Sequence, residues 1–356
     1  MQTNQPEISS AEPVRERVNL LDLDRAGMAE LINDKPYRAA QVFEWVFGRY
    51  AETIAEMTNL SKVLRAELDQ KAEIRYPTLA GHQISLDGTE KFAYRLHDGH
   101  VIESVLIPDE DHATICVSSQ VGCAMGCRFC YTGTLGFKRN LAVGEIMAQV
   151  LLPRKLYPKR NIRNIVFMGM GEPMLNFDNV IRSIAAITDQ RGPDFSYRRV
   201  TVSTCGVIPG VTRLGRESRV SLAVSLNATT DEQRSQIMPI NRKYPLKELM
   251  QALRDFELPK RRRITLEYVL LGGFNDSLAD ARRLIKLAGG LNAKVNLIPF
   301  NAWPGSDLKS PEPKNVMAFE QCLMDSPVTV MLRREKGSDI LAACGQLAGG
   351  INAGTD

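Results

Sequence analysis

The sequence predicts an α/β protein whose main part is a parallel sheet, either open or curled into a full or partial barrel. Three observations lead to this expectation. Apolar strand-like segments and helical stretches alternate from residue 113 onward, which is the pattern of βα units joined by right-handed crossovers. Two Asp-Gly pairs separate alternating segments between residues 82 and 107, as in a β-meander. Before them, residues 20–68 carry apolar side chains at helical spacing.

The N-terminal pattern is helical after a polar start. Residues 1–17 are expected to form a flexible N-terminus. Two apolar faces follow at helical spacing: Leu21, Leu23, Met28, Leu31 and Ile32, then Ala40, Val42, Phe43, Val46 and Phe47. Pro36 stands where a new helix would begin, because proline is tolerated in the first helical turn.

The meander is expected from three alternating segments around the Asp-Gly turns: His82–Leu86, Lys91–Leu96 and Val101–Ile107. A boundary is expected near residues 95–105. It separates an N-terminal unit of residues 18–100, made of helices and meander, from a core of residues 101–350 with a tail at 351–356. The chain has 356 residues, which is long enough for one large and one small domain.

The core alternates seven expected strands with five expected helices. The strands are Ala113–Ser118, Asn164–Met168, Arg199–Thr204, Val220–Leu226, Ile264–Leu270, Lys294–Pro299 and Val328–Arg333. The helices cover residues 142–157, 177–188, 246–257, 277–288 and 315–325. Unusual residues follow the strands rather than precede them. Because active sites of parallel α/β folds lie at the carboxyl ends of strands, we expect five loops to converge on one site.

Three of the seven cysteines lie in the loop after the first core strand, as Cys123, Cys127 and Cys130. A structural zinc site needs four ligands, and none of the four histidines follows His112. Three thiolates on a 4Fe-4S cluster would instead leave one iron open for a small molecule. The spacing therefore favours iron–sulfur over zinc. Cys205 and Cys322 are expected to be structural, since most free cysteines are small buried hydrophobes.

Composition and charge say more about the cellular compartment of the protein than about its function. The chain is 44% hydrophobic and 24% charged, with no signal-peptide pattern and no apolar run of membrane-spanning length, so a cytoplasmic protein without a membrane partner is expected. The net charge is only +4, yet four segments are locally basic: Pro158–Arg163, Arg198–Arg199, Lys260–Arg263 and Arg333–Arg334. Such clusters suit a polyanion, although a basic cluster is more often a solvated face.

The cysteine spacing, with Phe129 before the last thiol, resembles the radical S-adenosylmethionine enzymes. Gly169-Met-Gly-Glu-Pro173 is similar to the strand end with which that superfamily holds the methionine amino group. The resemblance implies a partial (β/α)6-type barrel. It also implies that the open iron binds the amino and carboxylate groups of S-adenosylmethionine, which is then cleaved to a 5′-deoxyadenosyl radical.

Longer runs resemble one family within the superfamily, the RlmN-type ribosomal and transfer RNA adenine methyltransferases. These runs are Pro36–Trp45, Cys116–Cys123, Phe167–Pro173, Met238–Asn241 and Asp339–Gly349, and the likeness extends from about residue 18 to 350. The resemblance implies methylation of carbon 2 of adenosine in 23S rRNA, at the peptidyl transferase centre, and in tRNA beside the anticodon. The N-terminal unit and the basic segments would hold the RNA by its phosphates.

The family resemblance also implies roles for two distant cysteines. A first S-adenosylmethionine methylates Cys344, and a second yields the radical that takes hydrogen from the S-methyl group, so two cofactor molecules are used per turnover. Cys116 resolves the protein–RNA link as a transient disulfide with Cys344. Glu103 matches the position given as proton acceptor; the alternative for this residue is an exposed glutamate at a strand edge.

The remaining residues implied by the resemblance bind the cofactor: Gly171, Glu172, Ser203, Ser225, Leu226, Asn227 and Asn301. The family usually has histidine where this chain has Asn227. Asparagine keeps a side-chain donor but has no titratable proton. Implied partners are the RNA substrates and an external, flavodoxin-like electron donor, and a monomer is expected.

Three alternatives stay open at this point. The first is a related enzyme that methylates carbon 8 of the ribosomal adenine and confers antibiotic resistance. The second is a zinc-stapled RNA-binding module without catalysis. The third is a radical enzyme acting on a small metabolite, which would not need Cys344.

Overall fold

The computed structural model describes residues 17–333 and 335–349, and one ten-stranded sheet forms its centre. The strands follow the order β14-β13-β12-β11-β10-β9-β6-β5-β4-β3, with free edges at β14 and β3 in the described part of the chain. The sheet is therefore a partial barrel, and the predicted α/β fold class is confirmed. The expected flexible start (1–17, apart from Arg17) and the tail at 351–356 lie outside the described residues.

Seven strands of this sheet run parallel, and all seven coincide with predicted segments. They are β6 (Ala113–Cys116), β9 (Ile162–Phe167), β10 (Val200–Thr204), β11 (Ser221–Ser225), β12 (Ile264–Leu270), β13 (Ala293–Pro299) and β14 (Thr329–Leu332). Their side chains are mostly apolar and buried, as expected for strands covered on both faces.

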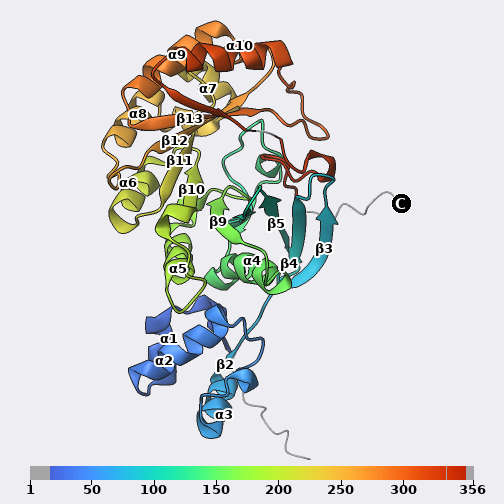
Figure 1. Ribbon diagram of the computed structural model, residues 1–356, viewed down its shortest axis with the longest axis vertical. Helices are drawn as coiled ribbons and strands as arrows, with labels where there is room; N and C mark the ends of the chain where they lie inside the picture. Colours follow the sequence, from blue (N-terminus) through green and yellow to red (C-terminus); the bar gives the residue numbers. More distant parts are fainter. Residues whose placement is uncertain (1–16, 334, 350–356) are drawn as a thin grey trace, which may run out of the picture.

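Seven helices follow the core strands and pack around the outside of the curved sheet (Figure 1). They are α4 (Val143–Leu156), α5 (Phe177–Thr188), α6 (Ile208–Glu217), α7 (Asp231–Ile237), α8 (Leu246–Arg254), α9 (Leu278–Gly289) and α10 (Pro313–Met324). The sequence did not predict α6 and α7. Pro209 and Gly210 in the first turn of α6 obscure its pattern, and α7 is short and almost entirely polar.

The N-terminal helices form a small lobe beside α4 and α5 (Figure 1). It contains α1 (Arg25–Ile32), α2 (Pro36–Phe43) and α3 (Lys62–Lys71), and a short parallel pair joins β1 (Val18–Asn19) to β2 (Ala72–Glu73). The Gly144 N–H donates to Asp22 Oδ1 at 2.7 Å. A Cβ at position 144 would lie 2.8 Å from Leu21 Cβ, so this close approach requires glycine.

The meander is confirmed as β3 (Thr78–Ile84), β4 (Glu90–Arg95) and β5 (Val101–Pro108). Both turns use the predicted Asp-Gly pairs, and Gly88 and Gly99 have φ values of +80° and +86°. β5 pairs antiparallel with β6, so the meander continues the parallel sheet. The expected boundary near residues 95–105 falls between β4 and β5, which pair with each other along their length. Among the described residues, no helix is both long and apolar enough to cross a membrane.

Candidate active site

A cavity of about 150 Å³ lies at the carboxyl ends of the parallel strands, and we call it the cluster cavity. Loops after β6, β9, β10, β11 and β13 converge on it, in the arrangement that the sequence predicts. Nine predicted site residues line it: Cys123, Cys127, Cys130, Gly171, Glu172, Ser203, Ser225, Asn301 and Cys344. This edge of the sheet is where parallel α/β proteins place their ligands.

The cluster cysteines lie on one loop between the short strands β7 (Gln120–Gly122) and β8 (Phe137–Asn140). Gly122 has a φ of +71°, and a Cβ there would lie 1.8 Å from the Gly136 carbonyl oxygen, so only glycine allows this hairpin. The pairing closes the loop and turns its thiols toward the cluster cavity.

The three thiols fit an iron–sulfur cluster in chemistry and position. Cys123, Cys127 and Cys130 line one cavity, and each lies close enough to another to perturb its ionisation. Burial raises the pKa of Cys123 to about 12, so a bound cation is needed to keep such buried thiols ionised. Among the described residues, no three His, Cys, Asp or Glu side chains converge as the ligands of a single metal ion would. Cys123, Cys127 and Cys130 thus offer three thiols spread around a cavity, each able to ionise when it binds iron.

The loop after β9 contacts β7 on one side and the loop after β10 on the other. Gly171 has a φ of +97°, and a Cβ there would lie 2.5 Å from Gln120 Cβ. The Glu172 carboxylate accepts hydrogen bonds from Met174 N at 3.0 Å and from Cys205 N at 2.8 Å. Burial raises the pKa of Glu172, and these two backbone donors oppose that shift. Glu172 therefore reaches the cavity wall in a fixed orientation.

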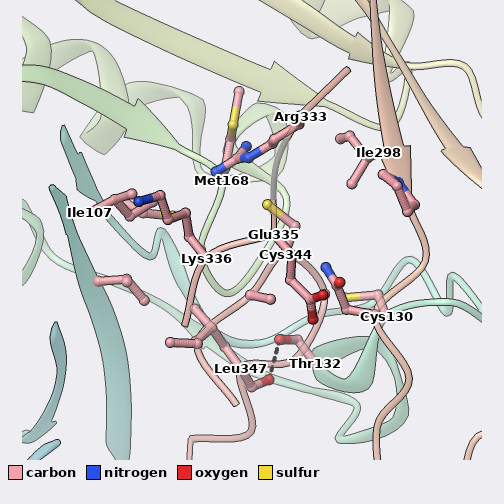
Figure 2. A pocket seen from close by; sticks show the side chains of 18 residues that line it. Ile107, Cys130, Thr132, Met168, Ile298, Arg333, Glu335, Lys336, Cys344 and Leu347 are labelled. Atoms are coloured by element: carbon pink, nitrogen blue, oxygen red, sulfur yellow. Dashed lines mark hydrogen bonds between the residues drawn. The ribbon is translucent and has the colours of Figure 1, made fainter. Parts of the chain in front are cut away.

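A second, smaller cavity of about 60 Å³ brings Cys116 and Cys344 together, and we call it the thiol cavity (Figure 2). Both cysteines are free thiols in this structure. Burial raises the pKa of Cys116 to about 12, the nearby Cys344 adds to the increase, and Arg333 opposes it. Cys344 also lines the cluster cavity, so it borders both spaces, as does Cys130 of the three-cysteine motif. Figure 2 shows the Arg333 side chain extending across the cavity beside Cys344.

Cys344 is held by a segment that we call the strap, residues 337–349. At its start, Gly337 N donates to Asp87 Oδ2 at 3.0 Å, and Ser85 Oγ donates to Asp339 Oδ1 at 2.5 Å. These contacts fasten the strap to the turn between β3 and β4. Around the thiol, the Gly345 carbonyl accepts a hydrogen bond from Tyr131 N at 2.7 Å, directly after the last cluster cysteine. The strap thus joins the meander to the cysteine loop.

Glu103 fastens the end of the strap. Its Oε2 accepts hydrogen bonds from Ala348 N at 2.7 Å and Gly349 N at 3.1 Å, and its Oε1 lies 3.5 Å from Lys91 Nζ. The residue is only 1% exposed, so the alternative of an exposed strand-edge glutamate is wrong. Glu103 lines neither the cluster cavity nor the thiol cavity. In this structure its carboxylate orients the segment that carries Cys344.

Leu226 and Asn227 are fully buried and line neither of the two cavities. Asn227 has a φ of +58° and accepts a hydrogen bond from Val269 N at 2.9 Å through Oδ1. Asn275 Nδ2 donates to the Asn227 carbonyl at 2.7 Å. The asparagine thus joins the loop after β11 to the end of β12.

Replacing Asn227 by alanine is expected to lower the stability of the protein by about 2–4 kcal/mol. The change leaves the part-buried Val269 N–H without its acceptor and places alanine in a left-handed conformation. The shift of the urea unfolding midpoint measures this loss. Asn292→Ala is the matched control, because Asn292 makes an exposed hydrogen bond to the Arg262 carbonyl. Equal shifts for the two variants would contradict the structural role of Asn227.

Two buried charged residues at this site, Glu267 and Arg234, escaped the sequence reasoning, and the half-buried Arg333 was noted only as part of a basic segment. Glu267 lines the cluster cavity, Arg333 lines the thiol cavity, and Arg234 lies beneath both loops after β10 and β11. The Arg234 guanidinium donates to the carbonyls of Leu226, Ser225 and Cys205. The available signal for Glu267 was an acid in the middle of an otherwise apolar strand. For Arg234 the sequence holds no such signal, since every residue of α7 except Ile237 is polar.

Most of the basic segments lie away from the two cavities. Arg198–Arg199 precede β10 and Lys260–Arg263 precede β12, so both segments are at the amino ends of parallel strands. Pro158–Arg163 lies at the amino end of β9. Of the four segments, only the one containing Arg333 contributes a described residue to the site.

Comparisons with known proteins agree with this geometry. Residues 18–74 match the ribosomal RNA large subunit methyltransferase N-terminal domain, and residues 117–285 match the radical SAM superfamily. A protein of Pelobacter propionicus named dual-specificity RNA methyltransferase RlmN is 54% identical over 318 residues, covering 89% of this chain and 91% of the relative. Its namesake in Geobacter sulfurreducens is 53% identical over 317 residues, covering 89% and 87%.

A solved structure gives the same result for the fold. The crystal structure of a radical SAM methyltransferase from Sphaerobacter thermophilus is 42% identical and has a TM-score of 0.88 to this chain. The similarity covers 94% of this chain and all of the other.

Proposed function

Because the chain belongs to the RlmN family and is a radical S-adenosylmethionine RNA methyltransferase, we propose that it methylates carbon 2 of adenosine. The proposed targets are an adenosine in the peptidyl transferase centre of 23S rRNA and one beside the anticodon in tRNA. The observation that carries the proposal is the position of Cys344, which borders the cluster cavity and also faces Cys116 in the thiol cavity. A thiol in this position can receive a methyl group on one side and deliver it on the other.

Cys123, Cys127 and Cys130 would hold a 4Fe-4S cluster, and Gly171, Glu172, Ser203, Ser225 and Asn301 would surround S-adenosylmethionine. When bound, the cluster and cofactor together supply a 5′-deoxyadenosyl radical, which is needed because an adenine ring carbon is not nucleophilic. Two cofactor molecules would be used per turnover, one to methylate Cys344 and one to activate that methyl group. An external, flavodoxin-like electron donor would supply the electrons.

The two cysteines divide the remaining work. Cys344 carries the carbon to the adenine ring and is for a time bonded to the RNA through it. The Cys116 sulfur would then bond to the Cys344 sulfur as the Cys344–carbon bond breaks, with its electron pair left on the carbon, which takes up a proton and becomes the methyl group. The unpaired electron of the adduct would pass to the cluster. The RNA is thereby freed, and the disulfide that remains must be reduced by thiol exchange. Glu103 would accept the ring proton. Its carboxylate is engaged by Ala348 N and Gly349 N, so this role requires the end of the strap to shift.

The test is mass spectrometry of nucleosides after anaerobic incubation with methyl-deuterated S-adenosylmethionine and unmodified rRNA or tRNA. Adenosine methylated at carbon 2 and carrying two deuteriums is the expected product, because one deuterium is lost to the radical. Methylation at carbon 8 would overturn the assignment of the carbon. Three retained deuteriums would mean direct transfer and would overturn the route through Cys344.

Binding of RNA is expected to weaken by at least about tenfold when salt rises from 50 to 200 mM, as for three or more phosphate contacts. Lys336 and Arg333 at the thiol cavity, together with the N-terminal lobe, provide cations for such contacts. Filter binding or anisotropy with a tRNA probe measures the affinity at each salt concentration. Unchanged affinity across this range would contradict recognition through phosphates.

A further inference from the structure

Among the described residues that line the cluster cavity, one buried acid has no role in the proposed function. Glu267 lies in the middle of β12, is 6% exposed, and lines the cavity. In the sheet register its partner on β11 is Ser225, and β10 follows next with Ser203. The three polar side chains meet on the inner face of three adjacent strands whose other buried residues, apart from Thr204, are apolar.

The two oxygens of the Glu267 carboxylate differ in their surroundings. Oε2 accepts hydrogen bonds from Ser203 Oγ at 2.6 Å and from Ser225 Oγ at 3.4 Å. Oε1 accepts no hydrogen bond from any residue that the structure describes, and the cation that acts on the carboxylate, Arg333, does so through its charge without forming an ion pair within 4 Å. An acid of this kind at a cavity wall is costly unless a donor occupies the cavity.

We propose that Glu267 positions the ribose of S-adenosylmethionine by accepting hydrogen bonds from its 2′- and 3′-hydroxyls. This inference rests on the proposed use of that cofactor. The methionine end is assigned to the loop of Gly171 and Glu172 beside the cysteines, so the adenosyl part extends over β10–β13. Glu267 lies on β12, at the wall of the cluster cavity formed by these strands. Vicinal hydroxyls suit a carboxylate, and an acidic side chain recognises the ribose hydroxyls of dinucleotides in the same way.

Ser203 and Ser225 then act on the cofactor through Glu267. Ser203 and Ser225 line the cavity, but both hydroxyls donate to Glu267. They are positioning residues that fix the carboxylate and leave Oε1 directed at the ligand. Loss of either serine should therefore weaken ribose recognition through Glu267.

The test compares ligand binding to wild-type and Glu267→Gln protein with the cluster reconstituted under anaerobic conditions. The probes are S-adenosylhomocysteine and its 2′,3′-dideoxyribose analogue, measured by equilibrium dialysis. The wild type should prefer the hydroxylated probe by about tenfold or more, and Glu267→Gln should lose most of that preference. Ser203→Ala should reduce it in part. Iron content and the urea midpoint establish that each variant is folded and loaded.

Glu145→Gln is the matched control, because Glu145 is also a buried carboxylate but pairs with Arg139 outside the cavity. Its preference for the hydroxylated probe should equal that of the wild type. If Glu267→Gln kept the full preference, or lost affinity for both probes equally, the inference would be overturned. Failure of the loaded wild type to bind S-adenosylhomocysteine at all would instead overturn the proposed function. An analogue of S-adenosylhomocysteine with hypoxanthine in place of adenine gives one more check. If Glu267→Gln lost the preference for adenine over hypoxanthine instead of the preference for the ribose hydroxyls, the assignment to the ribose would be contradicted.

Discussion

Replacing Cys344 by alanine is expected to abolish methyl transfer to RNA, with a loss of more than about a thousandfold. Among the residues that the structure describes, two thiols border both the cluster cavity and the thiol cavity: Cys344 and Cys130, the latter a proposed cluster ligand. In the proposed route the Cys344 sulfur accepts a methyl group and later releases it, and no neighbouring group can replace it. Methylated adenosine in the RNA, quantified by mass spectrometry, measures the loss.

The loss must be separated from damage to the cofactor site. Cys344→Ala protein should keep its iron content and its affinity for S-adenosylhomocysteine, because the main-chain contacts of the strap do not involve the thiol. Cys322→Ala is the matched control: this cysteine lies on α10, outside both cavities, and its loss should leave activity unchanged. Methyl transfer by the Cys344→Ala enzyme would reject the proposed route.

Replacing Cys127 by serine is expected to remove the iron–sulfur cluster and with it all activity. Cys127 is the most buried of the three cluster thiols, and burial raises its pKa well above the usual value. A buried hydroxyl is a far poorer ligand than a thiolate, so two remaining thiolates should not retain the cluster. Iron and sulfide content of the anaerobically reconstituted protein, and its visible absorbance, measure the effect.

Cys205 offers a demanding control for this experiment. It lines the same cavity and lies close to Glu172, yet it is outside the three-cysteine motif. Cys205→Ser should keep its iron, since three thiolates are proposed to suffice. Iron loss in Cys205→Ser equal to that in Cys127→Ser would mean that the cluster has four protein ligands and no open iron.

The fold could be predicted because its signals are local. Each strand of the core is a short apolar run, and each meander turn carries an Asp-Gly pair whose glycine adopts a positive φ. The helix α6 escaped prediction because Pro209 and Gly210 weaken its pattern, although proline near a helix start is compatible with helix formation. The predicted strands and turns are those in which the residue pattern alone specifies the backbone conformation.

The contents of the site were predictable only in part. Residues at strand ends were found because the topology places them at one edge of the sheet. The hold of Glu103 on Ala348 and Gly349 joins positions some 245 residues apart, and no spacing rule reveals such a contact. Glu267 was overlooked for a different reason. Its neighbours are mostly apolar, so the segment was predicted as a strand and the single acid within it received no separate role.

The order of the strands has a consequence for how the chain folds. From β3 to β14, each strand of the large sheet pairs with the one that precedes it in that sheet along the sequence. A chain emerging from the ribosome can therefore extend the sheet at one growing edge, and no strand has to insert between two that are already paired. The meander supplies local pairings for the start, where loop closure is least costly. The strap follows β14, so Cys344 reaches its position only after the floor beneath it has been assembled.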